Sequence, residues 1–129
     1  MRIAVATSDF AKVAGHAGRA RKWLIYTIGA DGTASTPPER LELAAGDVFH
    51  YAENGKPHAL DGVDAVIAQS AGEGFLKNME TRGIRPVLTA EDDPAKAVRD
   101  LLTESLSPPR PRPIGSLVCK TIDLFSRHK

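Results

Sequence analysis

The sequence lacks the features that would assign a function most simply. It has a single cysteine, Cys119, so no disulfide, Cys-x-x-Cys redox pair or multi-cysteine zinc site can form within one copy. The first ten residues contain only a short apolar run at residues 3–6, too brief for a signal-peptide core or a membrane span. These absences favour a cytoplasmic protein that is not bound to a membrane.

The chain also has almost no excess of positive or negative charge. The formal net charge is +1 at pH 7, but residues 1–106 hold 12 Lys or Arg and 15 Asp or Glu, whereas residues 107–129 hold five and one. Such a basic tail on a mildly acidic body can contact an acidic partner, nucleic acid or the body itself. The basic residues of the tail are scattered, with Phe125 as the only aromatic residue among them, so we expect no nucleic-acid partner.

Catalytic and closed metal-binding motifs are missing as well. No two histidines have the spacing that places two ligands on one helical turn. The four are His16, His50, His58 and His128. No nucleophile stands beside a base, and the acidic residues 91–93 are better explained as helix-capping residues. We therefore expect no enzymatic activity, and at most an open metal site to which the chain contributes one or two nitrogens.

The order of the apolar runs predicts one α/β domain over residues 1–106. Buried or half-buried strands are expected at residues 2–7, 23–28, 33–43, 63–68 and 84–89, the third starting late because two prolines cannot join a central ladder. A short helix is expected near residues 47–53, and two longer ones after the Gly72 turn and after Asp93-Pro94. In the last helix, an apolar stripe of Ala95, Val98, Leu102 and Leu106 is expected to face the sheet.

Beyond the domain, the prolines of residues 107–114 are too dense for a helix or a ladder and predict an extended linker. Residues 115–129 form a basic and apolar tail, which carries Cys119. The tail is too short to fold alone and is expected to dock on its own domain or on a partner.

The most informative segment is the glycine-flanked histidine His16, between the first two predicted strands. Three cations, Arg19, Arg21 and Lys22, follow it closely. An exposed imidazole beside positive charge suits a negatively charged ligand that carries a metal. The alternative is a solvated loop histidine without a function.

Two further segments could contribute to the same site. The turn with Gly72 and Gly74 follows a buried strand, where α/β sheets place their ligands, so we expect it to form one wall of the His16 cleft. A tight turn that needs glycine geometry would also explain these glycines. His58 lies in a polar turn and is a candidate second ligand, whereas His50, between Phe49 and Tyr51, is expected at the edge of the core.

Four segments together resemble the dinitrogenase iron-molybdenum cofactor biosynthesis family, the domain shared by NifX, NafY and the C-terminal part of many NifB proteins. They are residues 1–9, residues 16–26, residues 63–74 and residues 83–89. The resemblance implies a ribonuclease-H-like α/β fold, with a mixed central sheet of about five strands flanked by helices. It also implies a carrier of a metallocluster. His16 occupies the position of the family's candidate cluster ligand, where the family has His-Phe-Gly and this chain has Ala17 in place of the aromatic residue.

These observations lead to one functional hypothesis. The chain is expected to carry the iron–molybdenum cofactor or its iron–sulfur precursor without turnover, as a monomer or weak homodimer, and to deliver it to nitrogenase or to cofactor-assembly proteins. The predicted metal ligands are His16 and His58, and the predicted contacts to the rest of the cofactor are Gly18, Arg19, Arg21, Lys22, Ser70, Gly72 and Gly74. The alternative is a non-catalytic interaction or regulatory module that binds no cluster.

Overall fold

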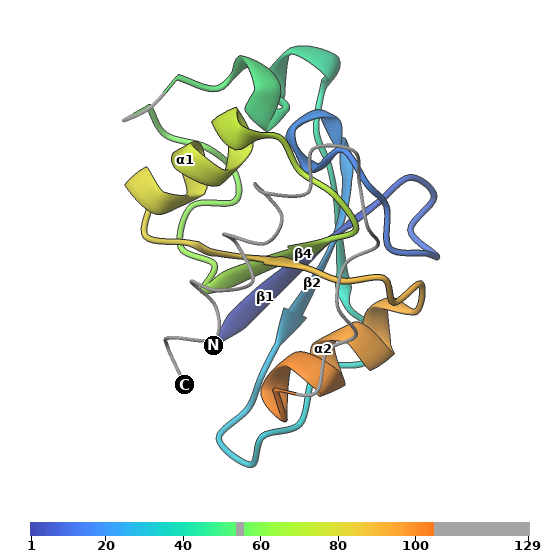
Figure 1. Cartoon of the computed structure of the whole chain (residues 1–129). Coiled ribbons are helices and arrows are strands. Elements are labelled where there is room, and N and C mark those ends of the chain that lie inside the picture. The colour runs from blue at the N-terminus through green and yellow to red at the C-terminus, as the bar shows by residue number, and fades with distance from the viewer. Residues whose placement is uncertain (54–55, 105–129) are drawn as a thin grey trace.

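The computed structural model describes residues 1–53 and 56–104. Five strands form one sheet in the order β3-β2-β1-β4-β5 (Figure 1). Their bounds are β1 Arg2–Thr7, β2 Lys22–Thr27, β3 Glu39–Glu42, β4 Ala65–Ala68 and β5 Arg85–Leu88. β2 pairs antiparallel with both β1 and β3, and β4 pairs parallel with both β1 and β5. The predicted α/β fold with a mixed sheet of five strands flanked by helices is therefore confirmed.

Helices cover both faces of the sheet. Helix α1 spans Glu73–Thr81 and helix α2 spans Pro94–Leu102. Figure 1 shows them on opposite sides of the strands. Three short 3₁₀ turns, η1 (Ala17–Arg19), η2 (Ala45–Asp47) and η3 (Phe49–Tyr51), complete the described elements. One buried cluster joins α1, η1 and η3 to the sheet, and a second joins α2 to the other face.

Strand β1 shows why the central strands have continuous apolar runs. Ala4 and Ala6 belong to the cluster under α1, whereas Ile3 and Val5 belong to the cluster under α2, and all four are fully buried. Because successive side chains point to opposite faces and both faces are covered, residues 3–6 in the middle of the strand are all apolar.

The late start expected for the third strand is confirmed, since β3 begins at Glu39, after the two prolines. Two other local expectations were wrong in detail. The short helix expected near residues 47–53 is replaced by the 3₁₀ turns η2 and η3. In α2 the buried residues are Pro94, Ala97, Val98 and Leu101. Of the predicted stripe, Val98 is buried, Leu102 is half-buried and packs against the same cluster, and Ala95 is half-buried. Leu106 lies outside the described residues. Both sets have helical spacing, and the contact with the sheet selects between them.

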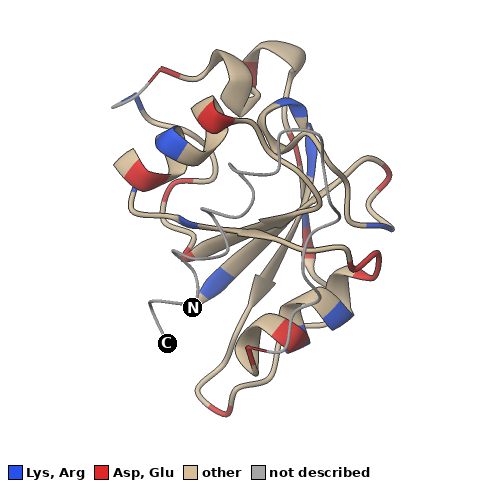
Figure 2. Cartoon of the chain, viewed as in Figure 1, with Lys and Arg blue, Asp and Glu red and all other residues tan. Residues whose placement is uncertain are grey.

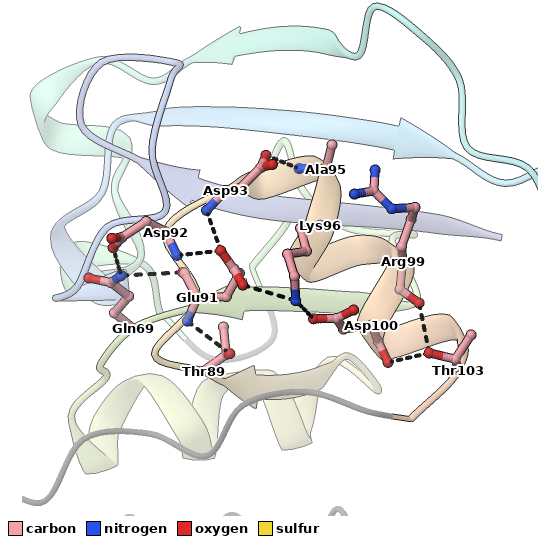
Figure 3. A network of polar contacts seen from close by, with 10 residues as sticks. All are labelled: Gln69, Thr89, Glu91, Asp92, Asp93, Ala95, Lys96, Arg99, Asp100 and Thr103. Carbon is pink, nitrogen blue, oxygen red and sulfur yellow. Dashed lines mark hydrogen bonds and ion pairs between the residues drawn. The ribbon is translucent and has the colours of Figure 1, made fainter.

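The ends of the helices follow the sequence signals. Gly83 after α1 has φ +69°, the left-handed conformation expected at a helix C-terminus. Before α2, Asp93 Oδ1 accepts a hydrogen bond from Ala95 N (3.1 Å). The carboxylate of Glu91 accepts from Asp92 N and Asp93 N and pairs with Lys96 (3.2 Å; Figure 3). These acidic residues cap and brace the start of α2, as their positions in the sequence predicted.

Charged residues of both signs are spread over the strands, helices and loops of the described part (Figure 2). Within that part, neither helix has the length and apolar character needed to cross a bilayer. The predicted linker at residues 107–114 and the tail at residues 115–129, with Cys119 and His128, lie outside the described residues.

Candidate functional site

The loop between β1 and β2 is held to neighbouring segments along its length. Val13 N donates to Asp92 O (2.8 Å), which ties the loop to the segment before α2. Ala14 N donates to Ala6 O (2.8 Å), and Gln69 N donates to Ala14 O (2.9 Å). The loop is therefore an anchored part of the fold, and the glycines in it do not make it free to move.

Ser70, two residues after the end of β4, fixes the residues around His16. Its Oγ accepts a hydrogen bond from His16 N (2.8 Å), and its carbonyl oxygen accepts from Ala17 N (3.0 Å). A Cβ on Gly15 would lie 2.5 Å from Ser70 Oγ, which is closer than real Cβ contacts allow. Gly15 is thus needed for this close approach, and Ser70 positions the loop.

His16 itself has a backbone conformation that is rare for a residue with a side chain. Its φ is 52° and its ψ 54°, in the left-handed region, and its side chain is exposed. That conformation costs roughly 1–2 kcal/mol for an L-residue other than glycine. Strained residues that neighbouring hydrogen bonds hold in place are concentrated at functional sites, so the geometry supports a functional role for His16.

His16 lies at a pocket with a volume of about 570 Å³. Three segments line it: the β1–β2 loop, η3 and the start of α1. The residues of interest are His16, Gly18, Arg19, His50, Gly72 and Gly74. The structure therefore brings the predicted glycine turn to the His16 loop, as expected, and it adds His50.

The start of α1 leaves backbone amides available at this pocket. Gly72 is the N-cap residue, and no side chain caps the helix. A Cβ at Gly72 or Gly74 would meet no atom within 4 Å, and neither residue has a positive φ. The fold itself therefore does not require glycine at either position. The missing side chains leave the positive end of the helix dipole open to an anion in the pocket.

His50 and Arg19 are hydrogen-bonded to each other at the pocket. Arg19 Nη2 lies 3.1 Å from His50 Nε2. A guanidinium group can only donate, so Nε2 accepts, and the imidazole is neutral with its proton on Nδ1. The expectation that His50 lies at the edge of the core was wrong. In the 3₁₀ turn η3, Phe49 takes the buried position and His50 is exposed.

His58 lies away from the His16 pocket, in a second depression between η2 and the segment after η3. Its Nε2 donates to Asp47 O (2.8 Å), its Nδ1 accepts from Leu60 N (3.1 Å), and its ring stacks on Phe49 (centroids 3.8 Å apart). Burial lowers the pKa of this imidazole below 6.5. Because both ring nitrogens are engaged, His58 has a structural role, and we do not retain it as a ligand.

Of the three predicted cations, only Arg19 lines the pocket. Arg21 Nε donates to Leu43 O (2.9 Å), and its guanidinium lies 3.5 Å from Glu42. Lys22 lies on the other face of the sheet from its neighbour Trp23, with its Nζ 5.7 Å from the centre of the Phe10 ring. The alternation of side chains along β2 therefore separates charges that are adjacent in the sequence.

A buried arginine, Arg82, connects the segment that follows η3 to the C-terminal end of helix α1. The Arg82 side chain is only 6% exposed, and it pairs with Asp61 at 2.8 Å. It also donates to Asn78 Oδ1 (2.7 Å) and to the carbonyl oxygens of Glu53 (3.0 Å) and Lys56 (2.8 Å). These bonds fix the chain after His50 against the helix that begins at the pocket.

Phe49 is the packing centre beneath the pocket. Its ring meets those of Trp23 and Phe75 edge to face, with centroids 6.1 and 5.5 Å apart, and it stacks on His58. The four rings come from β2, η3, α1 and the segment before β4. This cluster sets the relative positions of the elements that line the pocket.

Among residues 1–53 and 56–104, no group of three or more His, Cys, Asp or Glu side chains could hold a metal ion. The described residues thus offer no cage for a single ion. They offer two imidazoles and one guanidinium at one pocket.

Comparison with known proteins places this geometry in a family. A family model described as "Dinitrogenase iron-molybdenum cofactor" matches residues 1–104. The chain belongs to this family. The match includes every pocket residue and every element of the sheet.

Solved structures share the fold of this dinitrogenase cofactor domain. PH0822 has a TM-score of 0.64 at 19% identity, with 83% of this chain and 94% of that chain covered. A protein from Methanocaldococcus jannaschii, proposed to be a dinitrogenase, has a TM-score of 0.61 at 19% identity, covering 83% and 92%. A protein from Thermotoga, proposed to be a NifB protein of the DUF35 family, has a TM-score of 0.54 at 21% identity, covering 82% and 90%. None of the curated proteins matches the chain.

Proposed function

We propose that this chain is a non-enzymatic carrier of an iron–molybdenum or iron–sulfur cluster, which binds in the pocket between the β1–β2 loop, η3 and the start of α1. The observation that carries the proposal is the exposed, strained His16, which Ser70 holds at the rim of that pocket. Membership of the dinitrogenase cofactor family supports the choice of cargo.

His16 has the chemistry and the setting of a metal ligand. A neutral imidazole supplies a nitrogen lone pair to iron and to other transition metals. Because Ser70 already fixes the backbone of His16, little conformational freedom is lost when the cargo binds. One protein nitrogen can therefore contribute fully to affinity without a cage of ligands around it.

The pocket also suits a negatively charged cargo. Arg19 brings a positive charge to it, and the uncapped start of α1 brings backbone amides and the positive end of the helix dipole. The bare backbone at Gly72 and Gly74 lets a bulky inorganic core approach closely.

The small number of ligands favours delivery over permanent storage. A resident iron–sulfur cluster is usually held by four cysteine thiolates. The described residues contain no cysteine, and they place no three metal-binding side chains together. A cluster that brings its own bridging sulfides needs few protein ligands, and few ligands allow it to leave again.

Anaerobic titration of the full chain with isolated iron–molybdenum cofactor tests this function. We expect the wild type to gain visible absorbance on binding and His16→Ala to lose most of it. Lys22→Ala is the matched control, since its side chain lies on the other face of the sheet. Equal binding by the wild type and His16→Ala, or no binding by the wild type, would contradict the proposal.

Delivery is the second half of the function. The recipient is expected to be cofactor-free nitrogenase or another protein of cofactor assembly. Loaded carrier mixed with cofactor-free nitrogenase should restore nitrogenase activity, while loaded carrier alone should show none. A carrier that retains its cluster in the presence of the recipient would show that the chain stores the cluster and does not deliver it.

A further inference from the structure

We infer that His50 supplies a second metal-binding nitrogen in this pocket, and that the metal displaces Arg19, which donates a hydrogen bond to that nitrogen. The inference rests on the proposed function, and it assigns to His50 the part that the sequence had assigned to His58. Its basis is the geometry between η1 and η3.

The two 3₁₀ turns place the two histidines at one pocket. His16 immediately precedes η1, and His50 lies within η3. The turns pack closely, since a Cβ on Gly18 would lie 3.9 Å from His50 N. Both imidazoles line the same space of about 570 Å³, and both side chains are exposed to it.

The Nε2 nitrogen of His50 is in the unprotonated form that can bind a metal. It accepts a hydrogen bond from Arg19, so this nitrogen carries no proton. The same lone pair that accepts a hydrogen bond is the one that coordinates a metal. His58 differs, because its Nε2 must carry a proton to donate to Asp47 O and its Nδ1 is occupied by Leu60 N.

Binding then requires only an exchange of partners. When the cluster enters, Arg19 releases Nε2, a metal–nitrogen bond replaces the hydrogen bond, and no proton is lost, because the imidazole is already neutral. The Arg19 guanidinium remains at the pocket, where it can donate to the anionic surface of the cluster. Arg19 therefore keeps His50 in the ligand form before binding and offsets charge afterwards.

The first test is an anaerobic cofactor titration of the full chain carrying His50→Gln. Glutamine keeps an acceptor for Arg19 but lacks the imidazole nitrogen, so its folding should match the wild type. We expect the affinity for isolated iron–molybdenum cofactor to fall roughly tenfold or more, since even indirect partners of metal ligands contribute that much. Wild-type affinity in His50→Gln overturns the inference and leaves the carrier function standing. Absence of binding by the wild type overturns both.

The second test needs no cargo. Nitrogen-15 NMR of the histidine rings should show the His50 proton on Nδ1 in the wild type, and Arg19→Ala should shift it toward Nε2. His58 is an internal reference, because its hydrogen bonds require the proton on Nε2 in both proteins. A His50 ring that carries its proton on Nε2 in the wild type would show that Arg19 does not hold it in the ligand form.

Discussion

Ser70→Ala tests whether the fold actively presents His16. The substitution removes the Oγ that accepts from His16 N at 2.8 Å. A hydrogen bond of this kind contributes about 0.5–1.5 kcal/mol to stability. The lost bond also releases a residue whose left-handed backbone costs roughly 1–2 kcal/mol, so the loop gains a route to relax.

The expected effect on binding follows from the same figures. A loss of about 1 kcal/mol of restraint lowers the equilibrium constant for the presented conformation of His16 about fivefold, so the apparent cofactor affinity should decrease by up to about fivefold. Urea unfolding gives the change in stability, and the anaerobic titration gives the change in affinity. Unchanged affinity in Ser70→Ala would show that the cargo does not depend on the presented conformation.

Gly15→Ala tests the same hydrogen bond by placing a methyl group against the Ser70 hydroxyl. Its Cβ would lie 2.5 Å from Ser70 Oγ, so the hydroxyl must move away from His16 N. Without the hydroxyl, the nearest remaining contacts of that Cβ are ordinary, at 3.6 Å to the Ser70 Cβ and 3.8 Å to its backbone nitrogen. Because Gly15 has no positive φ, alanine should then be neutral or stabilise by about 0.4–1 kcal/mol through the unfolded chain.

Gly15→Ala and Ser70→Ala therefore form a double-mutant cycle in which the sign of the coupling free energy is predicted. Gly15→Ala should destabilise the wild type by about 1 kcal/mol or more, but it should not destabilise Ser70→Ala. Additive effects on the free energy of unfolding would refute the contact on which this reasoning depends.

Three further predictions follow from the same region. His16→Gly should raise the free energy of unfolding by about 1 kcal/mol and abolish cofactor binding, because glycine adopts the left-handed backbone without strain; a destabilised variant in urea would argue against the strain. Asp61→Asn should lower the free energy of unfolding by about 1–2 kcal/mol, because it removes the charge that pairs with the nearly buried Arg82. The loss is limited because Arg82 keeps its other hydrogen-bond acceptors. Equal urea midpoints for the wild type and Asp61→Asn would contradict this pairing. Stability should also decline as the pH falls below 6.5, because burial lowers the pKa of His58, so the unfolded chain takes up that proton first. The decline should be smaller in His58→Gln, and an identical pH profile for both proteins would count against His58 as its source.

Most of the fold was predictable because it depends on signals that are local in the sequence. The continuous apolar runs predicted strands covered on both faces, Asp93-Pro94 predicted the start of α2, and Gly83 predicted the end of α1. The apolar face of α2 was not predictable, since two overlapping sets of residues had helical spacing and only the docked sheet distinguishes them.

For the candidate site, the sequence indicated the two segments that meet but not the side chains that face each other. His16 and the Gly72–Gly74 turn were both expected at one cleft, and the structure places them there. His50 was missed because an aromatic residue on either side implied burial, and only the 3₁₀ geometry of η3 turns it outward. Lys22 was included because it is close in sequence, although the alternation along β2 sends it to the other face.

The ring of Phe49 has a consequence for how this domain can diversify. It touches aromatic side chains from β2, α1 and the segment before β4, while the next residue along the chain presents an imidazole to the pocket. The size of the Phe49 side chain therefore sets the distances between η1, η3 and α1. A smaller residue there would narrow or tilt the pocket and leave every polar group that lines it unchanged, so the width of the pocket can be changed from inside the core.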